Sequence, residues 1–160
     1  MLRILKIAPL ERIHILLVED NEGDVMLTSE AFESVKLQCD LSVVRDGESA
    51  MNFLLSRHQY LGVKVPDLIL LDLNLPRKNG YEVLQFLKTN TNLKHIPVIV
   101  LSTSSSMDEV NKCYENHANC YITKPMDIES FFNIISKIEN FWLTAVNLPK
   151  KNRIENDQRQ

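Results

Sequence analysis

The stretch PDLILLDLNLPRKNG, residues 66–80, decides the fold. Its apolar run, residues 68–71, is flanked by prolines and ends on the carboxylate of Asp72. A short apolar run between turn residues is typical of a strand that is buried on both faces of a parallel sheet. The last residue of such a strand emerges at the edge where open α/β folds carry their sites. The sequence therefore makes Asp72 the first candidate functional residue.

The strand-then-helix pattern around Asp72 recurs along the chain. The run IHILLVED, from residue 13, precedes NEGDVMLTSEAFESV, in which apolar residues recur at spacings of three and four. The same order is found in LSVVRD with GESAMNFLLSRH, DLILLD with GYEVLQFLKTN, PVIVLS with SMDEVNKCYENH, and CYIT with DIESFFNIISKIENFW. Five such units predict a doubly wound α/β domain, with a five-stranded parallel sheet covered by helices on both faces.

One domain accounts for most of the 160 residues. We expect an N-terminal arm over residues 1–11, the α/β domain with an extended last helix over 12–148, and a polar tail over 149–160. The connection SRHQYLGVKVP, residues 56–66, is longer than usual for this class, which predicts a surface excursion or an extended helix end.

The composition excludes several classes of protein. No apolar run approaches the roughly 20 residues that span a bilayer, and the start MLRILKIAPLER is too short and interrupted for a signal peptide. We therefore expect a cytoplasmic protein and no membrane contact. The net charge of −3 disfavours DNA binding, which usually needs a basic face. Three cysteines without metal-ligand spacing suit reduced, buried thiols.

Polar side chains follow four of the predicted strands. They are, in chain order, Glu19, Asp20, Asp72, Ser102, Thr103 and Lys124. A parallel sheet brings its carboxyl-terminal strand ends to one edge, so we expect these side chains to converge. Three carboxylates in one cleft repel one another unless a cation lies among them, and oxygen ligands favour Mg²⁺. The sequence therefore predicts a magnesium site.

Each of these residues, taken singly, has a simpler explanation. A strand-end acid commonly caps a helix or forms a turn, the two hydroxyl residues could cap a helix beginning at Met107, and Lys124 could be a surface charge. Capping does not explain why all of them arrive at one edge of the sheet. The set as a whole therefore favours a functional site.

These motifs resemble those of response-regulator receiver domains, the phosphate-accepting half of two-component signalling. The pair ED after the first strand, LLDLNLPRKNG around the third, VLSTS at the fourth and YITKP after the fifth match that family in order and spacing, over roughly residues 12–142. The resemblance implies a flavodoxin-like receiver fold with strand order 2-1-3-4-5. It also implies a signalling switch, not an enzyme with conventional turnover.

The resemblance assigns a role to each site residue. Asp72 would accept a phosphoryl group from the phosphohistidine of a sensor histidine kinase. Ser102 would contact that group and Lys124 would pair with it. The Mg²⁺ ligands would be Asp20, Asp72 and the backbone carbonyl of Asn74, with Glu19 acting through a bound water. Asn74 and Ser104 would flank the path of the hydrolytic water.

The family's switch also maps onto this sequence. Ser102 would move toward the phosphoryl group, and Tyr121 would turn inward into the vacated space. Alternatively, Tyr121 is a half-buried sheet aromatic that never moves. The resemblance further implies a cis peptide bond between Lys124 and Pro125, an isomer that X-Pro bonds reach for only ~0.5–1 kcal/mol.

The last helix is more apolar than one buried face requires. Its core stripe would be Ile128, Phe131, Ile135, Ile138 and Trp142. Further apolar residues widen the arc beyond the ~100° of a core-facing helix: Phe132, Ile134, Phe141 and Leu143. With no output domain expected, we predict a homodimer or docked partner on Phe132, Ile134, Phe141, Trp142 and Leu143. The alternative is cover by the segment TAVNLP.

A narrower resemblance concerns the same end of the chain. The segment IENFWLTAVNLP and the long connection before the third strand resemble the single-domain response regulators of bacterial phytochromes, particularly the cyanobacterial kind. This resemblance implies a red-light-sensing histidine kinase as phosphoryl donor and a homodimer through the last helices.

Three rival classes were compared with these motifs. A phosphatase with an aspartyl nucleophile needs a proton-donating acid two residues after Asp72, where this chain has Asn74. A flavodoxin-like or dinucleotide-binding module needs a Gly-rich loop after the first strand, where VEDNEGD places acids. The remaining rival is a binding module that keeps the fold but signals without phosphorylation.

Overall fold

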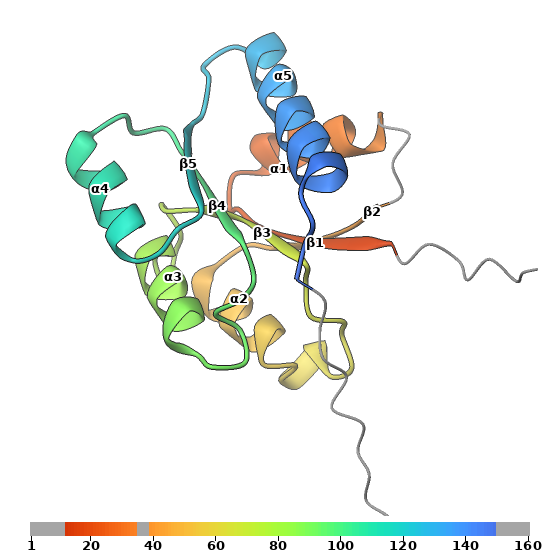
Figure 1. Cartoon of the computed structure of the whole chain (residues 1–160), viewed down its shortest axis with the longest axis vertical. Helices are drawn as coiled ribbons and strands as arrows, with labels where there is room; N and C mark the ends of the chain where they lie inside the picture. The colour runs from red at the N-terminus through yellow and green to blue at the C-terminus, as the bar shows by residue number, and fades with distance from the viewer. Residues whose placement is uncertain (1–11, 35–38, 150–160) are drawn as a thin grey trace, which may run out of the picture.

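A five-stranded parallel sheet forms the centre of the molecule (Figure 1). The structure, a computed structural model, describes residues 12–34 and 39–149, so the predicted arm and nearly all of the predicted tail lie outside the described residues. The strands are β1 (Ile13–Val18), β2 (Cys39–Val44), β3 (Leu68–Asp72), β4 (Val98–Ser102) and β5 (Cys120–Thr123). Their order, β2-β1-β3-β4-β5, confirms the predicted topology.

Helices cover both faces of the sheet. They are α1 (Glu22–Glu33), α2 (Gly47–Leu54), α3 (Gly80–Thr89), α4 (Met107–Glu115) and α5 (Ile128–Glu139), with a 3₁₀ turn, η1 (His58–Tyr60), and a π-helical segment, η2 (Asn140–Ala145). Helices α1 and α5 pack on one face, and α2, α3 and α4 lie on the other (Figure 1). This is the predicted doubly wound arrangement. Over residues 12–34 and 39–149, no helix is long and apolar enough to cross a membrane.

Strand β3 supplies apolar side chains to both faces, because successive residues of a strand point to opposite sides. Leu68 and Leu70 belong to the cluster under α1 and α5, whereas Ile69 and Leu71 belong to the cluster under α2 and α3. All five residues of β3 are buried. This double burial explains the uninterrupted apolar run that precedes Asp72.

The long connection before β3 does not extend the preceding helix, which was one of its two predicted forms. The helix does not extend to residue 58 but ends at Leu54. Ser56 and His58 have positive φ angles of 51° and 54°, in the left-handed region that an α-helix cannot contain. The chain then forms η1 and an exposed turn, with Leu61 77% exposed. The connection is therefore the surface excursion that the sequence allowed.

The last helix does not keep one pitch to its end. After Glu139 it widens into η2, so the α-helical spacing that predicted its apolar stripe no longer applies from Asn140 onward. The buried residues of α5 include Phe131, Ile135 and Ile138, as predicted. The assignment of Ile128 to the core stripe is wrong, because this residue occupies the first turn of α5 and is 63% exposed.

The extra apolar residues at this end of the chain are divided between core and surface. Phe132, Ile134, Trp142 and Leu143 are half-buried and pack against the cluster under α1 and α5. Phe141 is 58% exposed and meets Trp142 edge-to-face, with ring centroids 5.7 Å apart. The segment TAVNLP therefore leaves Phe141 uncovered, although its Val146 and Leu148 are half-buried.

Candidate functional site

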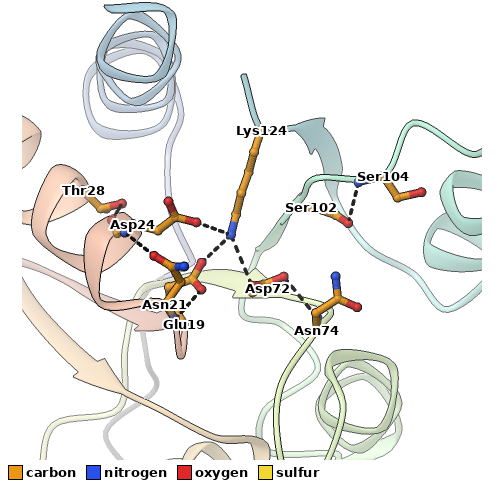
Figure 2. Close-up of polar contacts among 9 residues, drawn as sticks. All are labelled: Glu19, Asn21, Asp24, Thr28, Asp72, Asn74, Ser102, Ser104 and Lys124. Carbon is orange, nitrogen blue, oxygen red and sulfur yellow. Dashed lines mark hydrogen bonds and ion pairs between the residues drawn. The ribbon is translucent and has the colours of Figure 1, made fainter. Parts of the chain in front are cut away.

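Four of the polar residues predicted at the strand ends converge at one edge of the sheet (Figure 2), and the other two, Asp20 and Thr103, line the cleft at the same edge. Glu19 follows β1, Asp72 ends β3, Ser102 ends β4 and Lys124 follows β5. These four side chains are buried, although each has a polar or charged group. Asp20, the neighbour of Glu19, is exposed at the mouth of the site.

The Lys124 ammonium lies at the centre of the site. Its Nζ is 2.5 Å from Oε2 of Glu19, 2.9 Å from Oδ2 of Asp24 and 3.2 Å from Oδ2 of Asp72. Figure 2 shows Asp24 and Glu19 on one side of the ammonium and Asp72 on the other. Three carboxylates thus surround a single cation, which leaves the group with an excess of negative charge.

Burial and charge act in opposite directions on these groups. Burial raises the pKa of Glu19 to about 7, although the hydrogen bond and the charge of Lys124 oppose the increase. For Lys124, burial alone would lower the pKa, but the hydrogen bond and charge of Glu19, followed by the charge of Asp72, raise it above its usual value. Lys124 is therefore a permanent cation near neutral pH.

The loop after β3 fixes the position of Asp72. The backbone N–H of Asn74 donates to Oδ1 of Asp72 over 3.1 Å, and the N–H of Gly80 donates to the carbonyl of Leu73 over 2.9 Å. A Cβ atom on Gly80 would lie 2.3 Å from the backbone oxygen of Asp72, closer than any side chain can approach. Glycine at position 80 therefore allows α3 to start directly against the site.

A cleft of about 550 Å³ opens above these side chains. It is lined by Asp20, Asn21, Glu22, Asp24, Asp72, Asn74, Thr103 and Lys124. Most of these lining residues are polar or acidic, so the cleft suits a hydrated cation or a small anion held by one, and not an apolar ligand.

Three carboxylates of the site could hold a metal ion. Glu19, Asp20 and Asp72 each offer an oxygen, and these oxygens lie within 4.8 Å of one another. Two of the three residues are buried, and Lys124 provides only one positive charge for the whole group. An all-oxygen donor set with unbalanced negative charge fits a hard divalent cation such as Mg²⁺.

The structure also shows which residues cap the helices near the site. The side chain of Asn21 caps α1 by accepting a hydrogen bond from the Asp24 N–H, and Asn79 caps α3 in a capping box with Glu82. The N-cap residue of α4 is Ser106. Neither Asp72 nor Ser102 caps a helix, so the strand-end residues are not explained by helix capping.

Ser102 is connected to Tyr121 through the loop after β4. The N–H of Ser104 donates to Oγ of Ser102 over 3.2 Å, and the Tyr121 hydroxyl donates to the carbonyl of Ser104 over 2.7 Å. Tyr121 is half-buried, and its own N–H donates to the hydroxyl of Tyr114 in α4 over 3.2 Å. A movement of Ser102 would thus reach Tyr121 through one short loop.

The bond between Lys124 and Pro125 differs from the isomer that the resemblance implied. Every peptide bond in the described part of the chain is trans, and this bond is among them. The trans isomer is the one that X-Pro bonds favour in general.

Comparison with known proteins identifies this arrangement. The sequence profile of the response regulator receiver domain matches residues 15–136. The chain belongs to the response-regulator receiver family. Response regulator Rcp1 of Synechocystis sp. is 47% identical to it over 135 residues, which cover 84% of this chain and 92% of Rcp1.

Solved structures of phytochrome response regulators have the same receiver fold. The phosphorylated cyanobacterial phytochrome response regulator RcpA superposes with a TM-score of 0.85 at 45% identity, covering 87% of this chain and 99% of RcpA. The Mn²⁺-bound form of Rcp1 gives a TM-score of 0.84 at 46% identity, covering 86% of this chain and 99% of that structure. The narrower resemblance to phytochrome response regulators is therefore confirmed.

Two residues of the receiver site were missed from the sequence. Asp24 contacts Lys124 directly, and Asn21 holds the helix turn that presents it. A hint was available: Asp24 lies in the first turn of the segment predicted to be helical, directly after the acidic pair Glu19 and Asp20. Its contact with Lys124, a hundred residues away, could not be read from local spacing.

Proposed function

We propose that the protein is a phosphoryl-accepting signalling switch whose acceptor is Asp72. The observation that carries the proposal is the placement of this buried carboxylate at a polar cleft, 3.2 Å from the ammonium of Lys124 and within 4.8 Å of two further carboxylates. A lone buried acid would need only a counter-ion. A surplus of carboxylates beside one cation suits a site that takes up a metal ion and an anion.

The proposed reaction is a transfer between two side chains. A carboxylate oxygen of Asp72 attacks the phosphorus of a phosphohistidine, the new O–P bond forms, and the P–N bond breaks. The departing imidazole keeps the electron pair and takes up a proton. The products are an aspartyl phosphate and a neutral histidine. Because the protein is regenerated by hydrolysis of that acyl phosphate, it acts as a switch and not as an enzyme with conventional turnover.

The charges around Asp72 have distinct roles in this step. Lys124 would stabilise the negative charge that gathers on the equatorial phosphoryl oxygens, and Ser102 would donate a hydrogen bond to one of them. When Mg²⁺ is bound, it neutralises the remaining negative charge. Its ligands would be Asp20, Asp72 and the carbonyl of Asn74, with Glu19 acting through a water. The Mn²⁺-bound form of the relative Rcp1 supports a divalent ion here.

The switch would pass from Ser102 to Tyr121. The new phosphoryl charge attracts the Ser102 hydroxyl, which shifts the loop that holds Ser104. Because the Tyr121 hydroxyl donates to the carbonyl of Ser104, that shift changes the position of the aromatic ring. The readout would then be the surface around β5, α4 and α5.

The proposed donor is a sensor histidine kinase, and a phytochrome is the favoured kind. Rcp1 and RcpA, which share 47% and 45% identity with this chain, support this choice, because RcpA is a cyanobacterial phytochrome response regulator. The transfer from the kinase to the receiver would take place in the cytoplasm. We do not expect the receiver to bind DNA.

A homodimer through the end of α5 and η2 is also proposed. Phe141 supports it, because this large apolar side chain is 58% exposed beside half-buried Trp142 and Leu143. Phe132 and Ile134 would complete the interface from α5. Contiguous apolar surface of this kind commonly marks an interface between proteins.

The acceptor is tested by intact-protein mass after incubation with Mg²⁺ and acetyl phosphate. The expected result is one labile phosphoryl group on the wild type and none on Asp72→Asn. Asp67→Asn is the matched control, because it makes the same change at the other end of β3, and it should be phosphorylated normally. Uptake by Asp72→Asn, or none by the wild type, would overturn the proposal and favour a binding module that signals without phosphate.

The interface is tested by the oligomeric state in solution, measured by light scattering with and without phosphorylation. Phe141→Glu should shift the protein toward the monomer. Leu61→Glu is the matched control, because Leu61 is 77% exposed in the connection before β3, far from α5 in the sequence. Equal behaviour of the two variants would remove the support for this interface.

A further inference from the structure

The contacts of Lys124 use its full donor capacity. A lysine ammonium has three N–H donors, and three carboxylates accept from it: those of Glu19, Asp24 and Asp72. A phosphoryl oxygen can therefore pair with Lys124 only if one of these carboxylates gives up its hydrogen bond. The partner that is released helps to set how readily the receiver accepts a phosphoryl group.

We infer that Asp24 is a positioning residue that competes with the incoming phosphoryl group for Lys124. This inference rests on the proposed function of Asp72. Lys124 would exchange the Asp24 carboxylate for a phosphoryl oxygen as the O–P bond to Asp72 forms. Asp24 therefore slows phosphoryl acceptance and favours the unphosphorylated state.

Burial explains why Asp24 is the partner that is released. Its side chain is 29% exposed, whereas those of Glu19 and Asp72 are 3% and 8% exposed. A carboxylate that gives up an ammonium needs water in return, and only a partly exposed group obtains it at small cost.

The first turn of α1 holds Asp24 in place for this role. Its N–H donates to the side chain of Asn21 over 2.9 Å, and its carbonyl accepts from the Thr28 hydroxyl over 2.7 Å. The carboxylate therefore projects from a fixed helical turn toward Lys124 (Figure 2). Because the backbone is anchored, the ion pair breaks by movement of Lys124 and not by loss of the helix.

The helix offers a matched control in Glu22. This residue lies in the same first turn and lines the same cleft, but it is exposed, and its side chain is not among the carboxylates that contact Lys124. Asp24→Asn and Glu22→Gln each convert one acid to its amide. Each substitution removes one negative charge that repels an anionic phosphoryl donor. Only Asp24→Asn also weakens an ion pair with Lys124.

The test compares the rates at which acetyl phosphate modifies the wild type and both variants, across a series of Mg²⁺ concentrations. In this assay the P–O bond to acetate breaks and acetate departs with the electron pair. At saturating Mg²⁺, Asp24→Asn should react about fivefold faster than Glu22→Gln, the size expected for loss of one partly exposed ion pair. The half-saturating Mg²⁺ concentration should be the same in both variants.

A second readout needs neither metal nor donor. The ¹⁵N signal of the Lys124 ammonium, assigned by its loss in Lys124→Met, should shift in Asp24→Asn and stay in place in Glu22→Gln. Equal rates in the two variants, a slower Asp24→Asn or an unmoved ammonium signal would overturn the role of Asp24 alone. If the wild type takes up no phosphoryl group, the proposed function fails and this inference fails with it.

Discussion

The two ends of the central sheet both bury polar side chains, but they differ in charge balance. At the amino-terminal end, the His14 side chain is buried, and its Nε2 lies 2.8 Å from the Ser42 hydroxyl. The backbone N–H of His14 donates to the Asp67 carboxylate over 2.8 Å. At the carboxyl-terminal end, the Lys124 ammonium is surrounded by three carboxylates. One end is close to neutral, and the other carries an excess of negative charge.

This difference distinguishes buried polar groups that only complete hydrogen bonds within the fold from buried charged groups that suit a binding site. The hydrogen bond between Ser42 and Nε2 of His14 pairs two buried polar atoms without a net charge, which is how buried polar groups ordinarily occur. The excess of carboxylates around Lys124 has no such structural explanation, because replacing buried ion pairs with apolar side chains of similar volume is often neutral or stabilising. The unbalanced end is therefore the part of the sheet whose charge suits a bound cation, in keeping with the proposed function of Asp72.

The largest expected effect is on stability when the cation is removed from the unbalanced end. Lys124→Met leaves buried Glu19 and Asp72 without their counter-ion, so we expect a loss of about 3 kcal/mol in EDTA, measured by urea unfolding at pH 7.5. Added Mg²⁺ should recover part of this loss. Lys64→Met is the control, because Lys64 is exposed and lies 3.8 Å from Asp67, and its change should stay within about 0.5 kcal/mol. Equal losses would remove the contrast between the two ends.

The next effect concerns metal binding and pH at the same end. Glu19 has a pKa raised to about 7 by burial, so it becomes protonated as the pH falls below 7. A protonated carboxyl no longer attracts a cation, and Mg²⁺ affinity should fall by up to ~10-fold for each pH unit below that value.

The measurement is the rise in melting temperature on adding Mg²⁺ at pH 8 and at pH 5.5. The rise should be clearly larger at pH 8. In Glu19→Gln, which cannot titrate at this position, the rise should depend less on pH. A rise that is equally pH-dependent in both proteins would exclude Glu19 as the group responsible.

A smaller effect is expected at the balanced end. Ser42→Ala removes the partner of the buried His14 Nε2, which should lower the free energy of unfolding by about 1–2 kcal/mol. The rate of modification by acetyl phosphate should not change, because His14 lies at the opposite end of β1 from Glu19 and Ser42 does not line the cleft beside Asp72. A changed rate at unchanged stability would show that the two ends are coupled.

The smallest effect is the pH dependence of this balanced end. Burial lowers the pKa of His14 below its usual value of 6.5, so the unfolded chain binds a proton there more readily than the folded one. Stability from neutral His14 is fully present above pH 6.5 and is lost as the pH falls below it, by about 1.4 kcal/mol per unit of pKa difference. His14→Gln should flatten the urea-unfolding profile between pH 6.5 and 5, and an unchanged slope would contradict this account.

The sequence was sufficient for the sheet and for most of the site. The apolar runs predicted five buried parallel strands, and the rule that strand ends share one edge brought Glu19, Asp72, Ser102 and Lys124 together. These predictions depend on regular periodicity and on topology, which the sequence expresses directly. Asp24 was missed because its contact joins α1 to the segment after β5.

Departures from regular geometry could not be predicted. The left-handed φ angles of Ser56 and His58 end α2 early, and neither residue type requires that conformation. The π-helical segment after Glu139 changes the spacing on which the predicted apolar stripe relied. Ile128 looked like a core residue by periodicity, yet it lies in the first turn of α5 and remains exposed.

The most direct test of the central claim is to locate the phosphoryl group. Borohydride reduces an aspartyl phosphate to homoserine, and peptide mass spectrometry then identifies the modified position after incubation with Mg²⁺ and acetyl phosphate. Our account predicts homoserine at position 72 alone, with Asp20, Asp24 and Asp67 unmodified. Homoserine at Asp20 or Asp24, or its absence from every aspartate, would contradict the assignment of Asp72 as the acceptor.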